Sequence, residues 1–92
     1  MSAPKVIREE IVEGANSFTA TAFELDNAAL VFFDEKTRLR LGTLSFAMPR
    51  VEREAPSLAS VLLGDRNVAL SRIIAEQLAA ALGKIILASV FV

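Results

Sequence analysis

The sequence contains neither cysteine nor histidine, and these two absences exclude much of the usual chemistry of enzymes. Without cysteine, a protein forms no disulfides and no thiolate metal sites. Without histidine, it lacks the commonest general base and the commonest metal ligand. The composition therefore predicts a protein that is not an enzyme and that holds no metal and no cofactor.

A surplus of charge of either sign is also missing. Ten Lys and Arg residues stand against eleven Asp and Glu residues, which gives a net charge of −1. Nucleic-acid binding normally requires a clustered basic surplus, so we expect no nucleic-acid partner. No uncharged run approaches the roughly 18–20 residues that cross a membrane, and the N-terminus lacks the apolar core of a secretion signal. These features predict a cytoplasmic protein without a membrane partner.

What the sequence does have is apolar side chains, which make up 53% of only 92 residues. We expect a single domain over residues 1–92, and a domain this small buries only about 60–65% of its unfolded surface. Some large apolar side chains must then stay outside the core of a monomer, and contiguous patches of this kind usually mark protein contacts. The chain is therefore expected to form an oligomer.

The hydrophobic periodicity predicts strands and one helix in the order β-β-β-β-β-α-β. An edge strand is expected at residues 5–13, further strands at 18–22, 28–33, 38–48 and 57–63, a helix at 68–82 and a last strand at 84–92. Asp65 or Asn67 is placed to cap the helix, and Gly83 to end it. Its apolar stripe is predicted to consist of Leu70, Ile73, Ile74, Leu78, Ala81 and Leu82. The fold class is α+β, with a mostly antiparallel sheet of about six strands and one helix on one face.

Glycine at position 42 marks an irregularity in the predicted fourth strand. Leu39 and Leu41 are apolar at odd positions, whereas Leu44 and Phe46 are apolar at even positions. A glycine where the phase changes is typical of a β-bulge, so a bulge is expected at Gly42.

Two of the predicted strands, at residues 28–33 and 84–92, are apolar at both parities, so both of their faces should be dry. The helix covers one face only, and a second copy or a paralogue packed sheet-to-sheet would cover the other. The face of this dimer is assigned to Leu30, Phe32, Ile85, Leu87 and Phe91, and the opposite parity to the helix. The reverse assignment of the two faces remains open at this point.

Few residues suggest chemistry of their own. The acidic pairs Glu9–Glu10 and Asp34–Glu35 are interpreted as solvated charges, because neighbouring strand residues point to opposite faces. Arg38 and Arg40 share a strand face and are interpreted as an outward polar surface. The C-terminal residues Val90, Phe91 and Val92 either finish the last strand or dock on a partner, and their apolar run favours the strand.

Two segments resemble a known family. The run of residues 39–44, which ends in Gly42, Thr43 and Leu44, resembles a strand of the small proteasome-assembling chaperones. The run of residues 60–64 (SVLLG), followed by a helix that contains IAEQLA at residues 74–79 and then by an apolar strand, is similar to proteasome assembly chaperones 3 and 4. The likeness extends over roughly residues 9–92 and suggests an archaeal or otherwise minimal homologue, because the chain stops where the eukaryotic members continue.

The resemblance implies a non-catalytic dimer, with itself or a paralogue, that binds 20S proteasome α-subunits and assists formation of the α-ring. Client contacts are expected at a charged loop and at the polar face of the helix, namely at Arg50, Glu52, Arg53, Glu54, Arg72 and Glu76. One alternative is a small roadblock-like scaffold or regulatory dimer, although such domains normally have flanking helices at both ends. A less favoured alternative is a histidine-free isomerase with an Arg/Glu site between subunits, which would use Arg38 or Arg40.

Overall fold

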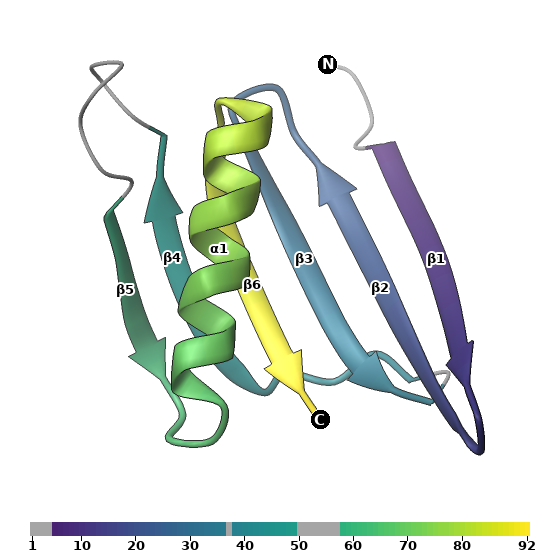
Figure 1. Ribbon diagram of the computed structural model, residues 1–92. Helices are drawn as coiled ribbons and strands as arrows, with labels where there is room; N and C mark the ends of the chain where they lie inside the picture. Colours follow the sequence, from purple (N-terminus) through teal and green to yellow (C-terminus); the bar gives the residue numbers. More distant parts are fainter. Residues whose placement is uncertain (1–4, 37, 50–57) are drawn as a thin grey trace.

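A six-stranded sheet carries one helix on one of its faces (Figure 1). The computed structural model describes residues 5–36, 38–49 and 58–92. The elements are β1 (Lys5–Glu13), β2 (Asn16–Glu24), β3 (Ala28–Glu35), β4 (Thr43–Met48), β5 (Leu58–Leu63), α1 (Val68–Leu82) and β6 (Ile85–Phe91). The predicted α+β class and element order are confirmed.

The strands lie side by side in the order β1-β2-β3-β6-β4-β5. The first three form an antiparallel meander, and β4 pairs antiparallel with both β5 and β6. The pair β3–β6 is parallel, so the sheet is mixed rather than purely antiparallel. The parallel pair arises because α1 returns the chain across the sheet and inserts β6 between β3 and β4 (Figure 1). This central place explains why β6 is apolar at both parities.

The helix lies on β4, β5 and β6 and leaves the meander β1–β2–β3 without a layer on the same side (Figure 1). Beneath α1 the sheet presents mostly small side chains. The core cluster consists of Ala29, Val31, Ala47, Ala75, Ala79, Ile86 and Ala88. Ser71 of α1 is also buried, and its hydroxyl donates to the Ser45 hydroxyl at 2.5 Å. Small residues at such a contact let a helix approach a sheet closely.

The predicted apolar stripe of α1 is partly wrong. Ile74 and Leu78 pack against the core, but Leu70 and Ile73 are 43% and 54% exposed. The inward face runs instead through Ser71, Ala75 and Ala79. The periodicity predicted that the largest apolar side chains of α1 face the sheet. The smallest ones face it instead, because they fit between the helix and the sheet.

The ends of α1 follow the expected positions but not all of the expected contacts. Gly83 ends the helix in the left-handed conformation, as predicted, and its N–H donates to the Ala79 carbonyl. Asn67 occupies the N-cap, yet its side chain accepts no bond from the helix and donates instead to the Val92 carbonyl at 3.1 Å. In the part of the chain that the structure describes, no helix is long and apolar enough to cross a membrane.

Gly42 is not a bulge. Residues 38–42 lie outside any strand, and β4 begins only at Thr43. A Cβ atom at Gly42 would lie 2.1 Å from the Val90 carbonyl oxygen, so glycine is required because two backbones meet there. The register irregularity lies further along the chain, between Leu44 and Ser45, where β4 pairs with β5.

Candidate protein-interaction surface

The face of the sheet opposite α1 carries a set of large apolar side chains. Strand alternation assigns it, because Ala29, Val31, Ile86 and Ala88 point to the helix side and their neighbours point away. We call this surface the helix-free face. It comprises Phe23, Leu30, Phe32, Leu44, Phe46, Ile85 and Leu87, all of them half-buried.

These side chains form one continuous patch, because their strands are neighbours in the sheet. Leu30 stands beside Leu87, and Phe46 stands beside Leu87 on its other flank. The rings of Phe23 and Phe32 meet edge-to-face, with centroids 5.9 Å apart. Edge-to-face contact is a preferred geometry of aromatic pairs, so these two rings stabilise each other within the patch.

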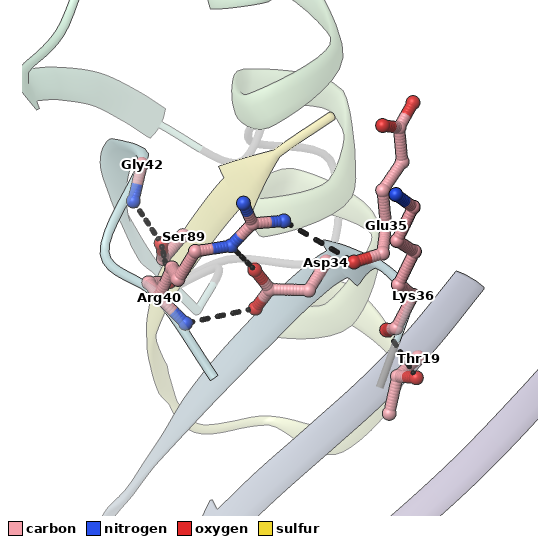
Figure 2. A network of polar contacts seen from close by, with 7 residues as sticks. All are labelled: Thr19, Asp34, Glu35, Lys36, Arg40, Gly42 and Ser89. Carbon is pink, nitrogen blue, oxygen red and sulfur yellow. Dashed lines mark hydrogen bonds and ion pairs between the residues drawn. The ribbon is translucent and has the colours of Figure 1, made fainter. Parts of the chain in front are cut away.

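One end of the helix-free face is crossed by the connection from β3 to β4, residues 38–42, which we call the strap. Asp34 holds it: its carboxylate accepts from the Arg40 Nε at 3.1 Å and from the Arg40 backbone N–H at 3.2 Å (Figure 2). Ser89 holds the other side, since its hydroxyl accepts from the Gly42 N–H at 2.8 Å (Figure 2). Asp34 and Ser89 are each 1% exposed, so the strap covers both of them.

The strap changes the role expected for Asp34. The sequence suggested a solvated turn charge, but Asp34 lies at the end of β3, paired with Phe91 of β6, and is buried. A buried carboxylate needs charged or hydrogen-bonding partners, and Arg40 supplies them. A signal for this contact was the short spacing between an acidic residue at the end of an apolar strand and an arginine shortly after it.

Arg40 is held by several contacts within the chain. Its guanidinium bonds to Asp34, donates to the Glu35 carbonyl and lies 3.9 Å from the centroid of the Phe91 ring. The isomerase alternative required Arg38 or Arg40 to meet a carboxylate in a cleft between subunits. Arg40 instead donates to the Asp34 carboxylate and to the Glu35 carbonyl, and these bonds hold the strap in place.

The residues assigned to the dimer face share one side of the sheet. Leu30, Phe32, Ile85 and Leu87 lie together in the patch, and Phe91 lies at its end, beside Arg40 of the strap. Val31, Phe33, Ile86, Ala88 and Val90 have the opposite parity, toward α1. The structure thus resolves which parity the helix covers.

The residues expected to bind a client are placed only in part. Arg72 is exposed on α1 and Glu76 is half-buried there. Arg50, Glu52, Arg53 and Glu54 lie outside the described residues.

A hollow lies on the helix side of the sheet, between α1 and the meander β1–β2–β3. It measures about 240 Å³ and is almost wholly apolar, with Ile7, Ala22, Val31, Leu78 and Leu82 among its lining residues. Its rim carries Glu24, which pairs with Lys84 at 2.7 Å. The hydrogen bond and positive charge of Lys84 lower the pKa of the Glu24 carboxyl below its ordinary value.

Acidic residues do not gather into a metal site in the described ranges 5–36, 38–49 and 58–92. The sequence matches no protein-family model, and no curated protein matches it either.

Proposed function

We propose that this chain is a non-catalytic assembly chaperone that works in the cytoplasm as a dimer, with the helix-free faces of two copies packed against each other. The client proposed is the 20S proteasome α-subunit, and the resemblance to proteasome assembly chaperones 3 and 4 suggests it. The observation that carries the dimer is the uncovered patch around Phe32, Phe46 and Leu87.

The patch supports this use because of its composition. Aromatic side chains dominate the cores of protein interfaces, and each contributes a large apolar area at a small entropic cost. Sheets that pack face to face lie about 10 Å apart, with their side chains interdigitated. In a two-fold dimer the same patch of each copy forms the interface, so the same residues are buried on both copies.

The outer side of such a dimer leaves α1 free to meet a client. Arg72 lies exposed on α1, close in sequence to Leu70 and Ile73, which are also exposed. A mixed apolar and charged helix surface suits a transient contact, in which charges raise the rate of encounter and apolar groups supply the affinity. We expect client binding to weaken as salt concentration rises.

The first test is the mass of the purified chain in solution, measured by light scattering at several concentrations. The proposal predicts a mass of at least twice 9.9 kDa. Phe32→Asp places a charge in the packed face and should separate the helix-free faces, which lowers the mass, whereas Ile73→Asp on the outer side of α1 should leave the mass unchanged. Circular dichroism verifies that both variants are folded, and Leu87→Ser serves as a second test of the same face.

The client is tested separately, with recombinant α-subunits in a co-elution assay. The parent chain should co-elute with at least one α-subunit, and Arg72→Glu should reduce that binding while leaving the mass of the dimer unchanged. A monomeric parent chain would contradict the dimer, and a dimer that binds no α-subunit would contradict the client.

A further inference from the structure

β1 is an edge strand whose outer side is open to solvent. All nine of its residues are exposed, and its one partner in the described sheet is β2. Open edges present unpaired backbone groups that can add a strand from another chain.

The sequence of β1 is complementary to itself when read in the opposite direction. About a centre at Glu9, charge meets opposite charge and each aliphatic residue meets its own kind. The facing pairs are Lys5 with Glu13, Val6 with Val12, Ile7 with Ile11 and Arg8 with Glu10. Cross-strand pairs of these types stabilise antiparallel strands.

Neighbouring registers lose this match. A shift of two residues in one direction places Ile7 opposite Glu13 and Arg8 opposite Val12. A shift in the other direction places Lys5 opposite Ile11 and Arg8 opposite itself. Only the register centred on Glu9 pairs every aliphatic residue with another one.

The backbone of β1 favours the same register. Glu13 and Asn16 flank the two-residue loop Gly14–Ala15, and the residues that flank such a loop form a hydrogen-bonded pair. Bonding alternates along an antiparallel pair. Odd-numbered residues of β1 therefore direct their N–H and C=O groups toward β2, and Val6, Arg8, Glu10 and Val12 direct theirs to the open edge. The register about Glu9 joins these four residues to one another.

We propose that a second copy of this chain pairs with the first through β1, antiparallel and across a two-fold axis at Glu9. The two sheets then continue into one, and both copies of α1 lie on the same side of it. The contact is independent of the proposed function, because it uses the sheet edge and leaves the helix-free face open.

The charges of β1 decide whether the edge pairs or stays open. Charged residues on an edge strand usually prevent pairing with other chains. Here the charges lie at positions that form opposite-sign pairs in one register, so they select that register and disfavour the others. Glu9 alone faces its own copy, and its charge opposes the contact.

The absence of cysteine makes a cross-linking test direct. In the proposed register Glu9 faces itself as a non-hydrogen-bonded pair, with Cα atoms about 4.5 Å apart, which is within the range of a disulfide. Glu9→Cys should therefore form a covalent dimer under mild oxidation. Glu10→Cys, equally exposed, is the matched control: its two copies would lie about 8 Å apart, beyond disulfide reach.

Both cysteine variants are made in the Phe32→Asp background, so that the helix-free face contributes nothing to the result. A cross-link at Glu9→Cys alone supports the edge contact even if the proposed function fails. Equal cross-linking at both positions, or none at either, would overturn the register. Absence of cross-linking would indicate that the charges of β1 prevent the edge from pairing with other chains.

A charge exchange tests the same register without a cross-link. Arg8→Glu places glutamates opposite each other twice across the axis, and Glu10→Arg does the same with arginines. Each should weaken dimerisation by about tenfold, and the double variant should restore it. Glu9→Gln should strengthen it by about two- to threefold. Arg8 and Glu10 face Thr21 and Thr19 of β2, so the exchange places no charge opposite a charged residue of β2. A double variant as weak as either single one would refute the pairing.

Discussion

The two faces of the sheet divide the apolar side chains by size. On the helix side the fully buried positions are mostly small, with Ala47, Ala75, Ala79 and Ala88 at the contact with α1. On the helix-free face the apolar residues are large and half-buried, Phe32, Phe46 and Leu87 among them. The contact with α1 is thus made mainly through small side chains, whereas the face without a helix carries large ones.

This difference separates two uses of apolar surface. Small side chains allow a single short helix to lie close to the sheet, and that close contact stabilises the monomer. Large half-exposed side chains stabilise the monomer less, since only buried area contributes. Their remaining area contributes when a partner covers it, and this is the reason for proposing the patch as an interface.

Enlarging a small residue at the contact between α1 and the sheet should destabilise the protein more than any other change considered. Ala79 is fully buried between α1 and the sheet, and Ala79→Leu has no space there. We expect it to lower the free energy of unfolding by about 3 kcal/mol. The measurement is urea denaturation in the Phe32→Asp background, which removes the proposed contact between helix-free faces. The control is Ala80→Leu, an exposed position of the same helix, where a change within about 0.5 kcal/mol is expected.

Removing the strap should enlarge the helix-free face at its covered end. Asp34→Ala takes away the carboxylate that accepts from Arg40 at two atoms and leaves the Arg40 N–H without this acceptor. We expect a loss of about 2 kcal/mol in unfolding free energy. Glu35→Ala removes an adjacent, exposed carboxylate and should have little effect. Equal losses in the two variants would show that the strap does not depend on Asp34.

Truncating a large residue of the helix-free face should cost the monomer less than its size suggests. Replacing a fully buried phenylalanine by alanine lowers the free energy of unfolding by about 3–5 kcal/mol. Phe46 is half-buried, so Phe46→Ala should cost the monomer about 1 kcal/mol. Denaturation in the Phe32→Asp background measures this value. A loss above about 3 kcal/mol would place Phe46 in the core of the monomer and remove it from the interface.

Much of this fold follows from local patterns in the sequence. The β1 strand matches its predicted range of residues 5–13, and α1 matches residues 68–82, because alternation and helical spacing are strong over those segments. The two-sided apolar pattern of residues 28–33 and 84–92 agrees with the place of β3 and β6 in the middle of the sheet. Strand order beyond hairpins is not local, so the parallel pair β3–β6 was not anticipated.

The strap shows why the remainder could not be predicted. Its conformation depends on Asp34, Arg40 and Ser89, and Ser89 comes from the opposite end of the chain. The apolar Leu39 and Leu41 suggested a continuous strand, yet the close approach of Gly42 to the Val90 backbone requires the chain to cross the sheet end first. A contact between such distant segments leaves no periodic signal in either of them.

The ion pair between Glu24 and Lys84 should have the smallest effect and tests how the bare meander is tied to the helix side. Because the pKa of Glu24 is lowered in the folded protein, its charged form stabilises the fold above the ordinary pKa of glutamate. That contribution is lost as the pH falls through the lowered pKa. Glu24→Gln should therefore melt below the parent at about pH 7 and equal it in strong acid. Asp26→Asn, at the exposed turn nearby, is the control. If the difference in melting temperature between Glu24→Gln and the parent persisted unchanged in acid, Glu24 would act through packing and not through its charge. The contact between the meander and the helix side would then be apolar, like the hollow beside it.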